Sequence, residues 1–175
     1  MQRHRVDRKS MRRLTTLLAA ALVAGPQGKP RAPSQPGPDS VIAQLYRDFA
    51  WEAVLDVSSA PTQVLIDQPR PVLRRYFDDR LTALILQDRA CAARTHGICR
   101  LDFDPLWASQ DPDGAHGVKV QSPDSLNVVR VALRYTNGYE VALGYRMSRT
   151  KEGWRIADID YASGPSLLTI LSSKH

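Results

Sequence analysis

Apolar residues recur at helical spacing in two stretches in the first half of the chain. The first stretch begins after Asp39-Ser40, which can cap a helix, and runs to about Trp51; its apolar face consists of Val41, Ile42, Leu45, Tyr46 and Phe49. The second begins near Pro71 and ends by Asp88, with an apolar face of Leu73, Phe77, Leu81, Leu84 and Ile85. The pattern predicts two helices joined by a mixed segment over residues 52–68.

Alternation of apolar and polar residues replaces helical spacing in the last third of the chain. Residues 129–135 and 141–147 each alternate, and Asn137-Gly138 between them is typical of a hairpin turn. Residues 117–121 and 153–161 supply two further strands, and a short helix follows Gly164-Pro165. The order of elements predicts an α+β domain, with N-terminal helices packed on a curved antiparallel sheet and a long loop over residues 89–115.

The N-terminus has the composition of a secretory signal peptide. Six basic residues and one acid between Arg3 and Arg13 precede an apolar run from Leu14 to Ala24, and Gly25-Pro26 follows. This run is too short to cross a bilayer as a helix, so we expect no stable membrane span after cleavage. Residues 1–25 therefore predict export to the periplasm or the medium, with Met11 as an alternative start. The pair Arg12-Arg13 also hints at a twin-arginine signal, but a plain secretory signal is favoured.

Residues 26–38 contain five prolines and two glycines, which predicts a disordered linker ahead of a single domain over residues 39–175. The whole chain has 24 Lys and Arg against 18 Asp and Glu. Without residues 1–25 the balance is 18 against 17, a net charge of +1. The basic excess therefore belongs to the targeting segment, and we do not expect nucleic-acid binding.

Cys91 and Cys99 are the two cysteines of the chain, and in an exported protein such a pair is expected to form a disulfide. His96 lies between them and leaves a Cys/His metal site as an alternative. Three ligands at this spacing match no zinc pattern, so the disulfide is favoured. The chain also lacks a glycine-rich phosphate loop and a histidine pair at metal-binding spacing, so we expect neither a metal nor a cofactor.

The acidic segment of the long loop resembles a calcium site only in part. Aligning Gly114 with the sixth position of the helix–loop–helix calcium motif places Ser109 at the first position and Val120 at the twelfth, where the motif needs a glutamate. We therefore expect turn-capping carboxylates, with a loose calcium site as the alternative. As candidate binding residues this loop contributes Asp102, Asp104, Gln110 and Asp111.

The last strand suggests a pocket. Simple alternation places Asp158 on the same face as Trp154, and a carboxylate on an apolar face is costly unless it is paired or used. With Tyr135 and Tyr145 as donors, Asp158 is the candidate base of a cofactor-free lyase or isomerase. The favoured interpretation is that Asp158 accepts hydrogen bonds where the strand turns and that the aromatic residues fill the core. The four residues remain candidates for ligand binding.

Two segments carry a family resemblance. Leu101 to Leu106 (LDFDPL) with Gln110-Asp111, and Trp154 to Tyr161 (WRIADIDY) with Ser166-Leu167, resemble the exported bacterial family called domain of unknown function 3828. The element order is similar to the cone-shaped fold of nuclear transport factor 2, over residues 40–172. The resemblance implies a small periplasmic or lipoprotein-type domain without an assigned activity. The chain lacks the acylated cysteine of the lipoprotein members, which favours a soluble periplasmic form.

Three functions remain open, because such a fold serves enzymes, ligand binders and interaction modules alike. The leading hypothesis is a non-enzymatic periplasmic domain that binds a small ligand or an envelope protein. The second is a periplasmic immunity protein that blocks a toxin. The third is the lyase or isomerase built on Asp158 and a tyrosine.

Overall fold

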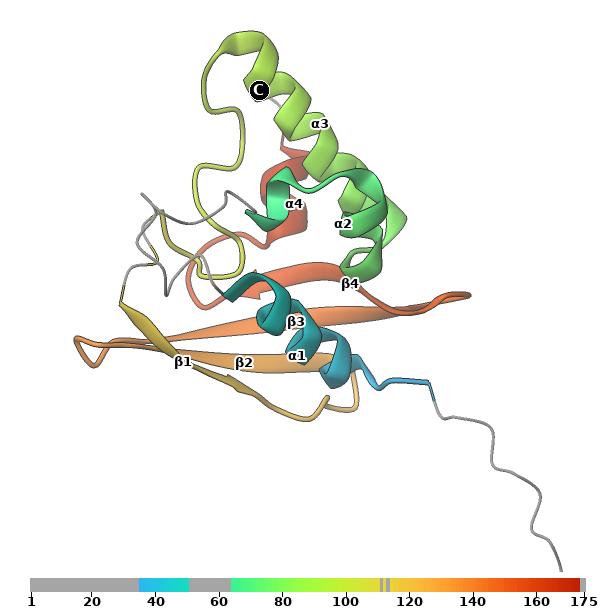
Figure 1. Cartoon of the computed structure of the whole chain (residues 1–175), viewed down its shortest axis with the longest axis vertical. Coiled ribbons are helices and arrows are strands. Elements are labelled where there is room, and N and C mark those ends of the chain that lie inside the picture. The colour runs from blue at the N-terminus through green and yellow to red at the C-terminus, as the bar shows by residue number, and fades with distance from the viewer. Residues whose placement is uncertain (1–34, 51–63, 111, 113, 174–175) are drawn as a thin grey trace, which may run out of the picture. The chain divides into compact units, whose positions relative to one another are not determined.

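The computed structural model describes residues 35–50, 64–110, 112 and 114–173 (Figure 1). The predicted signal peptide lies outside these residues, as do most of the predicted linker and residues 51–63. Residues Gln35–His175 form one unit, and the fold described here is that of this unit. The assignments of residues 1–25 and 26–38 therefore stay predictions.

Four antiparallel strands in the order β1-β2-β3-β4 form an open sheet. Their bounds are β1 Ala115–Val120, β2 Val128–Tyr135, β3 Glu140–Thr150 and β4 Gly153–Tyr161. The predicted alternation is confirmed in β2 and β3, whose buried residues are Val129, Val131, Leu133, Tyr135, Leu143, Tyr145 and Met147. The predicted hairpin is confirmed too, and its Gly138 has a φ of +81°, which glycine adopts readily.

Helix α1 (Pro38–Phe49) packs on the sheet, where it contacts β1, β2 and β4 (Figure 1). Its buried residues form the predicted apolar stripe and include Ile42, Leu45 and Phe49. The helix begins at Pro38, ahead of the Asp39-Ser40 cap predicted for it, and its N-cap is Gly37. Pro38 occupies the first turn, where its fixed φ suits a helix and its missing N–H costs nothing.

The remaining helices gather beside β4: α2 (Arg70–Tyr76), α3 (Asp79–Thr95) and α4 (Leu167–Ser172) (Figure 1). The single helix predicted over residues 71–88 is wrong, because the chain leaves the helix at Phe77. This residue forms a parallel bridge with Ile156 of β4, and the Asp78 N–H donates to the Ile156 carbonyl at 2.9 Å. The Asp78 carboxylate then caps α3 by accepting from the Leu81 N–H at 2.8 Å.

The loop predicted from residue 89 starts instead after Thr95, because α3 continues through Cys91. Alanine has the highest helix propensity, and the run from Arg89 to Arg94 (RACAAR) carries three of them. The helix ends at Thr95 and is followed by the C-cap residue His96, whose φ of 51° is left-handed.

A β-bulge in β4 corrects the predicted face of Asp158. Met147 of β3 pairs with Ile156, whereas the preceding Arg146 pairs with Asp158, so Ala157 is an extra residue. Directly opposed residues share a face of the sheet, so Asp158 belongs with Arg146 and not with the Ile156 face. The bulge breaks the period of two on which the prediction rested.

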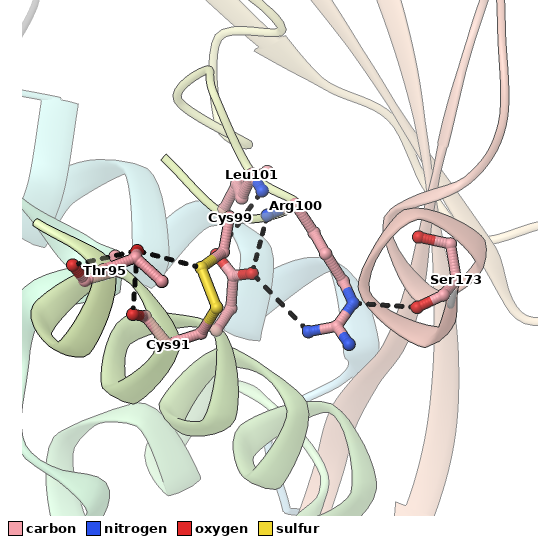
Figure 2. Close-up of a disulfide and its surroundings, with 8 residues drawn as sticks. Cys91, Thr95, Cys99, Arg100, Leu101 and Ser173 are labelled. Carbon is pink, nitrogen blue, oxygen red and sulfur yellow. Dashed lines mark hydrogen bonds and ion pairs between the residues drawn. A yellow bond between two sulfur atoms is a disulfide. The ribbon is translucent and has the colours of Figure 1, made fainter. Parts of the chain in front are cut away.

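The predicted disulfide joins Cys91 to Cys99, with Cα atoms 6.1 Å apart. Figure 2 shows that it lies beside a second link, centred on Arg100. The Arg100 N–H donates to the buried Asp88 carboxylate of α3 at 2.9 Å, and its Nε donates to the Ser173 carbonyl after α4 at 2.8 Å. Together these bonds hold the segment after α3 against both helices.

We predict that replacing both cysteines by serine lowers the free energy of unfolding by about 2.5 kcal/mol, because the closed loop restricts the unfolded chain. Urea denaturation of the oxidised protein and of the double variant measures the difference. The oxidised protein should also weigh two hydrogens less than its reduced form. Equal unfolding midpoints would show that the Arg100 hydrogen bonds alone hold this segment.

Candidate functional site

The centre of the domain holds a chain of buried hydroxyl groups. The Tyr46 hydroxyl donates to the Leu106 carbonyl at 2.8 Å, and it lies 2.7 Å from the Tyr145 hydroxyl. A hydroxyl has one proton, so Tyr145 must be the donor to Tyr46. This chain connects β3, helix α1 and the loop that contains Leu106.

Two further tyrosines bind the carbonyls on either side of Leu106. The Tyr135 hydroxyl donates to the Trp107 carbonyl at 3.1 Å, and the Tyr161 hydroxyl donates to the Pro105 carbonyl at 3.4 Å. Three consecutive carbonyls thus accept from tyrosines of α1, β2 and β4. We call the segment that they hold, residues 104–109, the 104–109 loop.

The 104–109 loop also closes on itself. The Asp104 N–H donates to the Ser109 carbonyl at 2.9 Å, and the Leu106 N–H donates to the Asp104 carboxylate at 2.7 Å. Ala108 has a left-handed φ of 52°, which turns the chain back. The turn buries Leu106 and Trp107 in the core.

Burial raises the pKa of the tyrosine hydroxyls above the ordinary value of 10.0, because a phenolate would lose its hydration. The negative charge of Asp104 raises the pKa of the same four hydroxyls further. All four are therefore neutral donors at physiological pH.

A pocket of about 480 Å³ opens beside the 104–109 loop. We call it the aromatic pocket, because its lining includes Phe103, Trp107, Tyr135, Tyr139 and Tyr161. Phe103 and Tyr161 form an edge-to-face pair with centroids 5.2 Å apart, and the Tyr135 and Tyr139 rings lie 6.0 Å apart. Tyr139 is 62% exposed, so its ring is available to a ligand.

The rest of the lining is small, apolar or polar. Ile170 of α4 and Pro165 before it form one wall, and Ser109, Asn137, Ser163 and Glu140 provide polar atoms. The Glu140 carboxylate accepts from the Arg134 Nε at 2.8 Å in an exposed ion pair. Trp107 Nε1 is buried without a hydrogen-bond partner among the described residues.

A second recess, of about 290 Å³, lies near the β3–β4 turn and has a different character. Charged side chains line most of it, including Arg74, Asp79 and Glu152. Arg74 Nε lies 2.7 Å from an Asp79 oxygen, and both side chains are largely exposed. Exposed ion pairs of this kind are ordinary surface features, so the aromatic pocket is the better candidate site.

Of the predicted pocket residues, Tyr135 alone lines the aromatic pocket. Tyr145 is fully buried in the hydroxyl chain. Trp154 is half-buried near the start of β4, where the Arg149 guanidinium lies 5.4 Å from its ring centroid.

Asp158 is buried and accepts from the Ile159 and Leu168 N–H groups, each at 2.8 Å. The second bond attaches α4 to β4. The structure therefore does not bring Asp158, Trp154 and the tyrosines together at one site, and it gives Asp158 the hydrogen-bonding position that the sequence favoured.

The loop candidates are dispersed as well. Asp102 is exposed and accepts from the Gln110 amide at 3.2 Å, whereas Asp104 belongs to the 104–109 loop. Asp111 lies outside the described residues. Within the described ranges, no group of three His, Cys, Asp or Glu side chains is placed to hold a metal ion.

Sequence reasoning missed most of the pocket, including Phe103, Trp107, Tyr139 and Tyr161. Phe103 and Tyr161 stand inside the two segments quoted for the family resemblance, which was a usable signal. Tyr139 follows the hairpin turn and Trp107 lies in an irregular loop, so no periodic pattern indicated their positions.

Comparison with protein-family models, with curated proteins and with solved structures finds no match to this chain. The fold and the site therefore define it only as an α+β domain with an open four-stranded antiparallel sheet and an aromatic pocket. Across the described residues, no helix is both long and apolar enough to span a membrane.

We predict an asymmetry between two conservative variants of the hydroxyl chain. Tyr46→Phe leaves the Tyr145 hydroxyl and the Leu106 carbonyl without their partner, and should cost about 3 kcal/mol of unfolding free energy. Tyr145→Phe removes one donor and leaves no other donor without an acceptor. It should therefore lower the free energy of unfolding by only about 1 kcal/mol. Urea denaturation measures both, with the exposed Tyr139→Phe as the control. Equal losses would contradict the direction assigned to the chain.

We also predict a loss of stability at alkaline pH. The folded-state pKa values lie above the unfolded value of 10.0, so the unfolded state releases its protons first as pH rises. The stabilisation is complete below pH 10 and should fall above it by about 1.4 kcal/mol per pH unit for each buried tyrosine. Urea denaturation between roughly pH 9 and 11.5 should show this decrease in the free energy of unfolding. The decrease per pH unit should be smaller in Tyr145→Phe, which has one buried tyrosine fewer. A flat profile would refute it.

Proposed function

We propose that this is an exported, non-enzymatic binding domain that holds a small organic molecule in the aromatic pocket. The observation that carries the proposal is a pocket lined by five aromatic side chains beside a loop that is hydrogen-bonded to three elements of the fold. A volume of about 480 Å³ lies within the range of small-molecule sites. A few polar atoms among apolar walls are also typical of such sites.

Side chains that are already held in place support binding, because they lower the entropic cost of association. Trp107 and Tyr135 reach the pocket from elements that are already held by the hydroxyl bonds, so a ligand would not need to order them. The exposed Tyr139 is the lining aromatic with the most freedom to close over a ligand.

The positions of the candidate acid–base groups favour binding over the lyase or isomerase alternative. A general acid needs a transferable proton near the substrate, but the Tyr135 and Tyr161 protons are donated to backbone carbonyls. One oxygen of the Asp158 carboxylate accepts from two amide groups, and Asp158 does not line the pocket. These groups build the site and hold its walls.

Export is part of the proposal. The disulfide between Cys91 and Cys99 is typical of proteins from oxidising compartments, which agrees with the signal-like composition of residues 1–25. The relation to the cone-shaped fold also stays a proposal, supported by helices that pack on an antiparallel sheet with bulged strands.

A blocking variant tests the function. Ala162 is exposed at the pocket wall, so Ala162→Trp should fill the pocket without disturbing the core. Ser125→Trp places the same side chain at an exposed position outside the pocket lining and serves as the matched control.

Native mass spectrometry of the protein purified gently from the periplasm should show a small adduct that denaturation removes. The adduct should be present in the control and absent in Ala162→Trp. An adduct that survives in Ala162→Trp would place binding elsewhere. The absence of any adduct from the wild-type protein would overturn the proposal.

A further inference from the structure

The described lining of the aromatic pocket contains a negative side chain and no positive one. It contains five aromatic rings and the Glu140 carboxylate, and none of its described residues is a lysine, arginine or histidine. The faces of aromatic rings carry negative electrostatic potential, and they attract cations within about 6 Å of the ring centroid. An anion entering this pocket would lose its hydration without gaining a counter-charge.

The buried hydroxyl groups add to this potential. Tyr135 and Tyr161 donate their protons to the Trp107 and Pro105 carbonyls, which leaves their oxygens as acceptors. The Asp104 carboxylate belongs to the 104–109 loop, whose residues Trp107, Ala108 and Ser109 line the pocket, and its negative charge disfavours ionisation of both hydroxyls. Arg134, which pairs with Glu140, moderates the charge at the rim and is itself exposed.

From this arrangement we infer that the ligand is an organic cation whose substituted ammonium group is held against the accessible rings of Phe103, Tyr139 and Tyr161. The inference rests on the proposed function and names the ligand class. A substituted ammonium suits the site better than a metal ion, because it is weakly hydrated and needs ring faces and apolar walls in place of oxygen ligands. Glu140 and Asn137 at the rim can bind polar substituents of the same molecule.

Choline and its neutral isostere 3,3-dimethylbutan-1-ol test the inference, because they share shape and differ in charge. Titration of the isotope-labelled full-length protein followed by NMR should show choline binding about tenfold more tightly than the alcohol. The anionic isostere 3,3-dimethylbutanoate should bind most weakly of the three. Equal or tighter binding of the neutral alcohol would overturn the inference.

Two variants assign the preference to named groups. Tyr139→Leu keeps apolar surface and removes the ring, so it should weaken choline binding several-fold and leave binding of the alcohol nearly unchanged. Glu140→Gln should reduce the preference for choline by a smaller factor, since Arg134 already shares the charge of Glu140. A preference that survives in both variants would contradict the assignment.

The outcomes separate this inference from the proposed function. If neither choline nor the alcohol shifts the pocket resonances while a denaturation-sensitive adduct is lost in Ala162→Trp, the pocket binds another class of ligand and the cation inference fails. If neither compound binds and the wild-type protein also shows no denaturation-sensitive adduct, the proposed function fails together with the cation inference.

Discussion

The need to satisfy buried tyrosine hydroxyls is the constraint on which the rest of the domain depends. An unpaired polar group in the core costs about 1–3 kcal/mol, comparable with a large part of the stability of a small domain. Tyr46 meets this need only when helix α1, strand β3 and the 104–109 loop come together in one register. The hydroxyl chain therefore specifies a unique arrangement as well as adding stability.

The same constraint shapes the candidate site. Holding the carbonyls of Pro105 and Trp107 fixes an irregular loop that the sheet alone would not position. The part of the lining that comes from α4, Ile170, depends on Asp158, whose carboxylate attaches α4 to β4 through the Leu168 N–H. These hydrogen bonds hold the 104–109 loop and α4, which both contribute to the pocket lining, and this suits a binding site whose walls are formed before the ligand arrives.

The sequence predicted the elements well where periodicity is strong. The first helix, the hairpin at Asn137-Gly138 and the last strand were all correct, and so was the disulfide between Cys91 and Cys99. It failed where a distant contact decides the local structure. The break between α2 and α3 depends on a bridge from Phe77 to β4, and nothing in residues 70–88 indicates that bridge.

The pocket was predictable only in part for the same reason. A single bulge residue, Ala157, changes the face of the strand after Ile156 and separates Asp158 from Trp154, which alternation had placed on the same face. Trp107 and Tyr139 come from a loop and a turn whose paths are set by hydrogen bonds across the fold, so their proximity has no local signature. Tyr135 was identified because it belongs to a regular strand.

Native-state hydrogen exchange would test the central claim most directly. If the hydroxyl bonds make the 104–109 loop part of the core, the amides of Leu106 and Trp107 should exchange only through global unfolding. Their opening free energy should then equal that of Val131 in the sheet. Exchange of the loop amides through a local opening of much lower free energy would contradict the account, because the loop would then be an independent surface segment.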